Sequence, residues 1–272
     1  MYVSYWQLHE RPFEHWCDPR FYYAAEAHQA ALLKLRYAIE NRQGGAVLAG
    51  PSGSGKTLLV AMLRAALGPE HTPVVRVVFP QMTAEHLVAY LAGRLSGEAG
   101  PAPDAAAVHR SIEQVERSLA AGAERGQHAV VVIEEAHLLD DRRVLEALRL
   151  LLNCGPEGRP ALTLLLVGQP GILPLLDRMP QLQDRLAIRC LLRPLDEPET
   201  GEYVAHRLRT AGAMRPLFQS DALSTLYRLT HGIPRQINRL ADLALLVGYA
   251  EQGHAITAEQ VEAVHGELAP AA

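Results

Sequence analysis

Short runs of consecutive apolar residues alternate with longer segments of helical periodicity over the first two thirds of the chain. Unbroken apolar runs are typical of strands buried on both faces, whereas apolar residues three and four apart indicate one covered face of a helix. The predicted strands are residues 46–49, 74–79, 128–135, 161–167 and 189–192; the predicted helices are 25–41, one from residue 58, 83–95, 105–125 and 142–152. This alternation predicts an α/β fold, a parallel sheet with helices on both faces.

The pattern changes after Pro194, where only helical segments follow: 197–211, 221–230, 234–249 and 257–265. We therefore expect an α/β domain over residues 1–195 and a smaller all-α lid domain over residues 196–272. The irregular, aromatic segment 1–23 is assigned to the first domain. Residues 96–104, rich in Gly, Pro and Ala, are predicted to form a surface loop.

A phosphate-binding loop follows the first predicted strand. Residues 50–57 match G-x-x-x-x-G-K-[ST] at every constrained position, between an apolar strand and a helix. Its backbone N–H groups and the helix N-terminus favour phosphate oxygens. Lys56 is expected to reach the β- and γ-phosphates and the Thr57 hydroxyl to bind Mg²⁺. The predicted nucleotide-binding residues are Gly50, Pro51, Ser52, Gly53, Ser54, Gly55, Lys56, Thr57 and Leu58.

The composition of the chain excludes several classes of protein and of binding site. Lys34 and Lys56 are the only lysines, which rules out the Asn-Lys-x-Asp base-reading motif of P-loop GTPases and favours ATP. The net charge of −4 gives no general attraction to nucleic acid or acidic membranes. No run approaches the ~18 apolar residues of a membrane span, and the N-terminus does not resemble a signal peptide. Three scattered cysteines indicate reduced thiols, so a cytoplasmic location is expected; His9, His15 and Cys17 match no zinc-binding spacing.

Two carboxylates end the predicted strand 128–135. Hydrolysis of ATP needs an acidic residue near Mg²⁺ and a base that orients water at the γ-phosphate. Both functions fit the carboxyl end of a strand beside the phosphate loop. Glu134 is expected to hold the metal through water, and Glu135 to polarise the attacking water. His137, two residues further on, is interpreted as a residue at a helix start.

Several motifs in order resemble the AAA+ ATPases of the ExeA type, the general secretion pathway protein A family, within the ASCE class of P-loop NTPases. The chain is also similar to TniB-type transposition ATPases. The resemblance runs from about residue 2 to 250. Its motifs are Tyr5-Trp6-Gln7-Leu8 through Pro12-Phe13, Asp18-Pro19-Arg20-Phe21, Gly168-Gln169-Pro170, and Gly232-Ile233-Pro234-Arg235-Gln236-Ile237-Asn238-Arg239.

The resemblance implies roles for further side chains. Gln169 would contact the γ-phosphate or the water, and Arg235 would reach the phosphates from the lid. Arg185, or with less support Arg189, fits the place of a finger that reaches into a neighbouring subunit's site. Such a finger implies a homo-oligomer. A turn residue, for Gln169, and a surface ion pair, for Arg235, are the alternatives.

The chain departs from the family in two respects. The family's strand usually ends Asp-Glu, and Glu134 places the first carboxylate about 1.5 Å further out. Mg²⁺ tolerates distorted coordination poorly, so we expect slow hydrolysis. Longer members also carry a membrane span and a peptidoglycan-binding domain, which this chain does not show, so a role at the cell wall is not carried over.

Two functions stay open. The first is an ATPase that assembles or remodels a secretion or envelope complex. The second is an ATP-switched, DNA-binding regulator of transposition. A basic face on two predicted helices would favour DNA as a partner, although solvated arginines are the commoner explanation. The arginines concerned are Arg142, Arg143, Arg149, Arg207 and Arg209.

Overall fold

The computed structural model describes residues 1–14, 18–98, 107–155 and 160–268. The predicted loop beyond residue 98 and the residues His15 and Cys17 lie outside these ranges. The chain forms two compact units. One comprises Ala27–Gly50 and Leu59–Leu192, and the other Met1–Glu26, Pro51–Leu58 and Arg193–Ala272.

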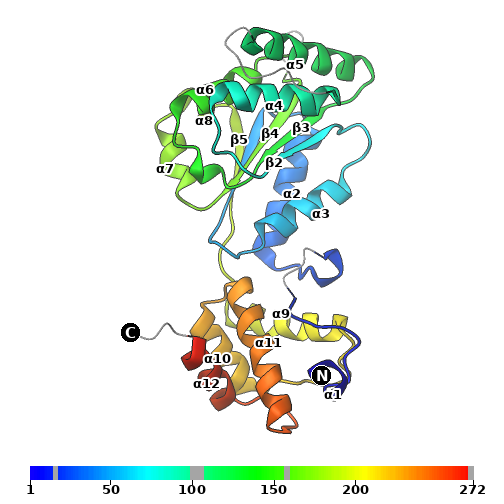
Figure 1. The fold of residues 1–272 in the computed structure, drawn as a ribbon, viewed down its shortest axis with the longest axis vertical. Helices are drawn as coiled ribbons and strands as arrows, with labels where there is room; N and C mark the ends of the chain where they lie inside the picture. The colour runs from blue at the N-terminus through cyan, green and yellow to red at the C-terminus, as the bar shows by residue number, and fades with distance from the viewer. Residues whose placement is uncertain (15–17, 99–106, 156–159, 269–272) are drawn as a thin grey trace. The chain divides into compact units, whose positions relative to one another are not determined.

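The first unit is built on a five-stranded parallel sheet (Figure 1). Its strands are β1 (Gly45–Ala49), β2 (Val74–Val77), β3 (Ala129–Ile133), β4 (Leu162–Gly168) and β5 (Leu186–Leu191). The strand order is β2-β3-β4-β1-β5, so β4 lies between β1 and β3. Every pairing is parallel, and the predicted sheet is confirmed.

Helices cover both faces of the sheet because successive strand residues point to opposite sides. Val47 and Val131 pack on one face, with α4 (Ala84–Ser96), α5 (Ala107–Glu124), α6 (Arg142–Leu151), α7 (Ile172–Asp177) and α8 (Pro180–Gln183). Leu48 and Val132 pack on the other face, with α2 (Glu26–Glu40) and α3 (Lys56–Ala66). The unbroken apolar runs in the sequence follow from this burial on both sides.

Two strand boundaries differ from the predictions in ways that concern the site. β3 ends at Ile133, so Glu134 and Glu135 follow the strand instead of completing it. β5 begins at Leu186, three residues before the predicted start, because alternate exposed positions hide it from an apolar-run criterion. Thr83 caps α4 as predicted, and its hydroxyl oxygen accepts the His86 backbone N–H at 3.4 Å.

The second unit is helical, as the sequence predicts for the lid. It contains α1 (Tyr2–Tyr5), the 3₁₀ turn η1 (Pro19–Phe21), α9 (Glu197–Thr210), α10 (Ser220–Thr230), α11 (Pro234–Ala250) and α12 (Ala258–Leu268). An Asp196–Glu199 capping box begins α9, with both reciprocal hydrogen bonds present. Within the described ranges, no helix combines the length and the apolar character that crossing a bilayer requires.

The N-terminal segment corrects the predicted domain assignment, because residues 1–26 group with the lid helices. The buried Trp6 donates its indole N–H to the Leu245 carbonyl at 2.9 Å, and Phe13 and Phe21 belong to the same apolar cluster. The Arg207 guanidinium donates to the carbonyl of Pro12 at 2.6 Å. A small unit of short helices has little core of its own, and these aromatic side chains supply a large part of it.

Gly232 gives a stability prediction for the lid. It has φ of +69°, and a Cβ there would lie 1.8 Å from the Leu195 carbonyl oxygen. Gly232→Ala should therefore lower the unfolding free energy of this unit by about 3 kcal/mol through backbone strain and overlap. Urea titration followed by tryptophan fluorescence reports on this unit, because both tryptophans precede residue 27.

The matched control for this prediction is Gly266→Ala in α12. A Cβ at Gly266 meets no atom within 4 Å, and its φ is not positive. The substitution should change stability by less than about 1 kcal/mol, on the stabilising side. An unchanged urea midpoint for Gly232→Ala would contradict the predicted strain.

Candidate active site

The phosphate loop adopts a backbone that its glycines require. Gly53 and Gly55 have φ of +79° and +94°, in the region that other residues rarely adopt. The loop ends where α3 begins, at Lys56. Lys56 is only 8% exposed, and its Nζ donates to the Pro51 carbonyl at 2.8 Å, across the loop. A buried ammonium at a helix N-terminus, bounded by glycines, is an arrangement that suits phosphate groups.

Arg235 of the lid contacts this loop directly. Its backbone N–H donates to the Gly53 carbonyl at 3.2 Å, and its Nη1 lies 3.4 Å from the Ser52 hydroxyl. A Cβ at Gly53 would lie 2.6 Å from the Arg235 Cβ, so only glycine permits this approach. The side chain is exposed and comes from the first turn of α11. The two segments that the sequence separates by about 180 residues therefore lie side by side.

Glu134 is buried directly after β3. Its backbone N–H donates to the Val77 carbonyl at 2.8 Å, continuing the β2–β3 ladder by one residue. Its carboxylate pairs with the Arg76 guanidinium of β2, and the Glu134 residue is 4% exposed. Arg76 was not singled out in the sequence, since one arginine in an apolar strand gives no sign of its partner. The pair shows how an acidic residue is held in an apolar setting.

Glu135 has a backbone conformation that is rare for its residue type. Its φ and ψ are +50° and +34°, and it precedes the 3₁₀ turn η2 (Ala136–Leu138). Left-handed residues other than glycine cluster at functional sites, where the surrounding structure compensates for the strain. The Glu135 side chain is 49% exposed, in contrast to buried Glu134. The two adjacent carboxylates therefore have different environments, one paired and buried and the other open.

Gln169 follows β4 and contacts His137. The Gln169 backbone N–H donates to His137 Nδ1 at 3.3 Å, and the side-chain amide nitrogen lies 3.0 Å from His137 Nε2. A Glu135 carboxylate oxygen lies 3.6 Å from the same Nδ1. Gly168 permits this approach, because a Cβ there would lie 2.9 Å from the His137 backbone nitrogen. The sequence interpretation missed this contact, although His137 does lie in a helical turn as predicted.

The strand order brings these segments to one edge of the sheet. Glu134, Gln169 and Gly50 follow β3, β4 and β1, which are neighbours in that order. The Gly50 backbone N–H donates to the Gly168 carbonyl at 3.1 Å, so the first residue of the phosphate loop lies beside the residue before Gln169. The carboxyl edge of a parallel sheet is where ligands bind in such folds.

Arg185 lies at the opposite edge. It immediately precedes β5, and its carbonyl oxygen would be 3.0 Å from a Cβ at Gly44, the residue before β1. Arg189 lies within β5, and its guanidinium faces the Gln183 side chain. Both arginines are exposed. The amino ends of β1 and β5 are remote from the carboxyl edge, so Arg185 is not placed to serve the site of its own chain.

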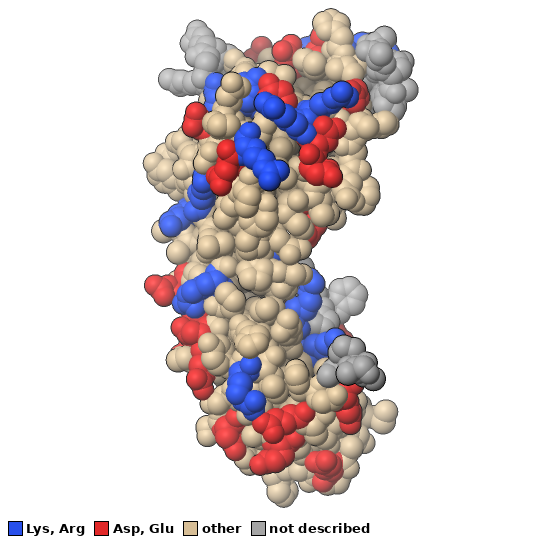
Figure 2. All heavy atoms as spheres, turned by 90° about the vertical axis from the view of Figure 1, so that its left-hand side faces the viewer, with Lys and Arg blue, Asp and Glu red and all other residues tan. Residues whose placement is uncertain are grey.

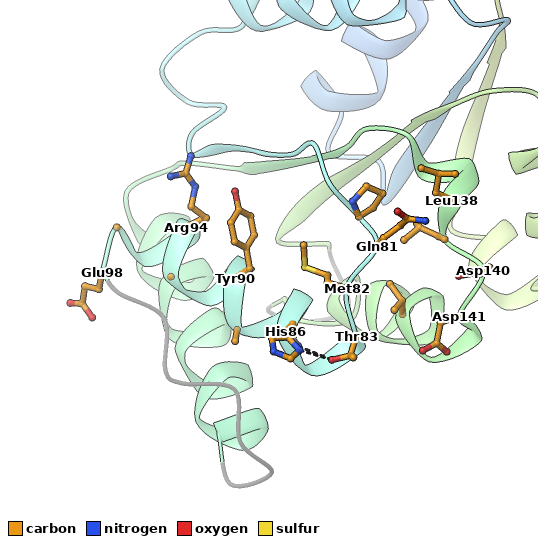
Figure 3. Close-up of a pocket in the computed structure, with 16 residues that line it drawn as sticks. Gln81, Met82, Thr83, His86, Tyr90, Arg94, Glu98, Leu138, Asp140 and Asp141 are labelled. Atoms are coloured by element: carbon orange, nitrogen blue, oxygen red, sulfur yellow. Dashed lines mark hydrogen bonds between the residues drawn. The ribbon is translucent and has the colours of Figure 1, made fainter.

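A hollow of 1060 Å³ lies behind the η2 turn (Figure 3). Its walls are the segment after β2, helix α4, Leu138 at the end of η2 and the segment that follows η2. Thr83 and His86, joined by a 2.8 Å hydrogen bond, line one side of it. Acidic and basic groups both line the hollow, among them Arg94, Asp140 and Asp141. The sequence did not predict this feature.

Two of the arginines proposed as a basic face are engaged within their own units. Arg207 is 5% exposed and is bound to carbonyl groups of the N-terminal segment. Arg149 makes two hydrogen bonds to the Glu146 carboxylate, at 2.9 and 2.7 Å. Figure 2 shows basic and acidic side chains interspersed over one face of the molecule. The argument for DNA as a partner is therefore weaker than the sequence suggested.

Comparisons with known proteins identify the family. A family model described as AAA domain matches residues 39–176, about half of the chain. General secretion pathway protein A of Aeromonas hydrophila is 34% identical over 276 residues, covering 100% of this chain and 48% of that protein. The chain thus spans about half the length of this curated relative.

Solved structures similar to this chain include Drosophila ORC bound to DNA, with a TM-score of 0.71 and 16% identity over 98% of this chain and 66% of that one. Cdc6p from Pyrobaculum aerophilum gives a TM-score of 0.71 and 15% identity, over 96% and 71% of the two chains. The RuvB Holliday junction branch migration motor of Thermotoga maritima gives 0.59 and 18%, over 90% and 70%. At these identities the likeness concerns the fold alone. The chain belongs to the AAA domain family and is an AAA+ protein of the general secretion pathway protein A type.

Proposed function

We propose that this chain binds ATP with Mg²⁺ and hydrolyses it slowly. The observation that carries the proposal is the glycine-bounded loop around buried Lys56, at the N-terminus of α3. The residues present fit the nucleotide, because the positive φ values of Gly53 and Gly55 shape a tight loop and the buried Lys56 offers an ammonium to the phosphates. When bound, ATP supplies the phosphoanhydride bond that is broken.

Five further side chains have roles in the proposed reaction. Thr57 and Glu134 offer the hydroxyl and carboxylate oxygens that Mg²⁺ prefers. Glu135, with its open carboxylate, accepts a proton from the attacking water. Gln169 and Arg235 hold phosphate oxygens, from the end of β4 and from the lid. Support comes from two backbone hydrogen bonds, each within one unit. Gly50 donates to the Gly168 carbonyl at 3.1 Å, and Arg235 donates to the Gly53 carbonyl at 3.2 Å.

The pairing of Glu134 affects the expected rate of ATP hydrolysis. Its carboxylate is already paired with Arg76, and it carries one methylene more than the Asp usual at this position. If Glu134 helped to hold Mg²⁺, its pairing with Arg76 would leave the carboxylate less free to move to the position that the metal requires. We therefore propose a turnover below the usual range of enzymes, whose median is about 10 s⁻¹.

ATP turnover by this chain would drive assembly or remodelling of a secretion or envelope complex in the cytoplasm. The similarity to general secretion pathway protein A over the whole chain supports this role. A homo-oligomer is part of the proposal, because Arg185 lies away from its own carboxyl edge and fits a neighbour's site. The regulator of transposition is less favoured, since Arg207 and Arg149 are engaged within the protein.

Phosphate release by the purified chain tests the proposal. With Mg²⁺ and ATP in excess, the wild-type chain should release phosphate steadily, and chelation of Mg²⁺ should stop the release. The same assay on Glu135→Gln supplies the baseline for contaminating activity. A wild-type rate equal to that of Glu135→Gln would remove the claim of hydrolysis.

A further inference from the structure

His137 lies between two residues of the proposed reaction. It touches Gln169 through both ring nitrogens and lies 3.6 Å from the Glu135 carboxylate. Its side chain is only 16% exposed. Since the reaction itself is a proposal, the role inferred for His137 rests on the proposed function.

The hydrogen bonds determine which ring nitrogen carries the proton. The Gln169 backbone N–H, at 3.3 Å, needs an acceptor at Nδ1. The competing arrangement would place the proton on Nδ1, directed to Glu135, but 3.6 Å is too long for a hydrogen bond. It would also leave the backbone N–H of Gln169 facing another N–H, at the cost of an unmade bond. The proton therefore lies on Nε2.

The proton on Nε2 in turn orients the Gln169 amide. Nε2–H needs an acceptor, and the Gln169 amide atom assigned 3.0 Å away is the nitrogen, which cannot accept, so we exchange the amide oxygen and nitrogen. The oxygen and nitrogen of an amide are assigned from the hydrogen-bond network, and this network puts the Gln169 oxygen toward His137. The Gln169 NH₂ group then points away from the ring. This orientation matters because phosphate oxygens only accept hydrogen bonds, so a residue that holds the γ-phosphate must present N–H groups.

We propose that His137 is a positioning residue, which as the neutral Nε2–H tautomer holds the Gln169 amide with its NH₂ group toward the γ-phosphate. Nδ1 accepts from the Gln169 backbone and makes no hydrogen bond to the Glu135 carboxylate, which lies 3.6 Å away and stays available to the attacking water. Gly168 is needed for this arrangement, because it lets η2 approach β4 closely enough for both contacts between His137 and Gln169.

Kinetics test the effect of this contact on the reaction. His137→Ala should lower kcat about 10²-fold, the size of effect that a misplaced group can cause, and leave the KM for ATP within about twofold. His137→Asn, which retains an acceptor near the position of Nδ1, should recover part of the loss. Exposed His109 on α5 gives the control, and His109→Ala should match the wild type.

A double-mutant cycle asks whether His137 acts through Gln169. If it does, His137→Ala adds almost nothing to the loss caused by Gln169→Ala, because coupled residues give non-additive effects. Multiplicative losses in the double variant, or a wild-type kcat in His137→Ala, would overturn the proposal.

Nitrogen-15 NMR of the histidine rings at about pH 8 gives a readout that needs no turnover. We expect His137 to show protonated Nε2 and unprotonated Nδ1, and to lose this fixed pattern in Gln169→Ala, whereas His109 should not change. A protonated Nδ1 in the wild-type chain overturns the proposal even if the ATPase is active. If the chain lacks ATPase activity altogether, the proposed function fails, and the NMR result still decides the tautomer and the contact with Gln169.

Discussion

Arg185→Ala should lower the rate of ATP hydrolysis about 10³-fold, near the lower end of measured arginine-finger effects. Arg185 precedes β5 beside the amino end of β1, away from the carboxyl edge that carries Glu134 and Gln169. In the proposed oligomer, the Arg185 guanidinium would spread positive charge over the phosphoryl group that is transferred in a neighbouring subunit. ATP affinity should change little, because the chain's own phosphate loop is intact. Steady-state phosphate release and equilibrium nucleotide binding measure the two effects.

Mixing two variants shows whether Arg185 acts in the site of a neighbouring subunit or whether its substitution damages its own chain. Arg185→Ala has an intact site and lacks the finger, whereas Glu135→Gln has the finger and lacks the base. Mixed oligomers of the two should recover activity that neither variant shows alone. Arg189→Ala is the control, since Arg189 faces Gln183 within its own chain, and its rate should stay within a few-fold of wild type. A large loss in Arg189→Ala with none in Arg185→Ala would reverse the assignment.

Glu135→Gln should lower kcat at least about 10²-fold while ATP binds as tightly as before. A general base contributes about 10² to 10⁴ to a rate, and the amide keeps the size of the side chain but cannot accept the proton of water. The Glu135 side chain is exposed, and the substitution does not relieve the strain of its left-handed backbone, so the fold should be unaffected. The measurement is a comparison of kcat with the dissociation constant for ATP.

Glu113→Gln, on the exposed side of α5, is the matched control for the loss of one carboxylate. It should leave both quantities unchanged. If Glu135→Gln instead weakened ATP binding and left kcat unchanged, Glu135 would be a binding group and the water would need another base.

Much of the fold could be read from the sequence because it depends on local patterns. Unbroken apolar runs mark β1, β3 and β4, which are buried on both faces, and the phosphate loop requires glycines at fixed positions. The placement of residues 1–26 could not be read in this way. Burial of Trp6, Phe13 and Phe21 against helices of the C-terminal part of the chain is a long-range packing event, since Trp6 and its partner Leu245 are 239 residues apart, and local composition gives no sign of the partner.

The site shows the same division. The spacing of Lys56 and Thr57 within one loop predicts their chemistry directly. The pairing of Arg76 with Glu134, and of His137 with Gln169, depends on strand order and on the close approach that Gly168 permits. Nothing adjacent to these residues in the sequence specifies such contacts. The sequence analysis therefore missed these two side-chain pairs, whereas it found the phosphate loop, whose residues are adjacent in the sequence.

The central claim is that the ammonium of Lys56 holds a magnesium–ATP complex. Isothermal titration calorimetry of Mg²⁺–ATP into Glu135→Gln, which binds without turnover, tests it most directly. We expect one site per chain, with affinity lost at least about 10²-fold when Lys56→Ala is added, since a partly buried ion pair and its hydrogen bonds are worth roughly 3 kcal/mol or more. Lys34, the other lysine in the chain, supplies the control, and Lys34→Ala should bind as tightly as its parent. The account would be contradicted if Mg²⁺–ATP gave no heat of binding, or if Lys56→Ala bound it as tightly as the parent.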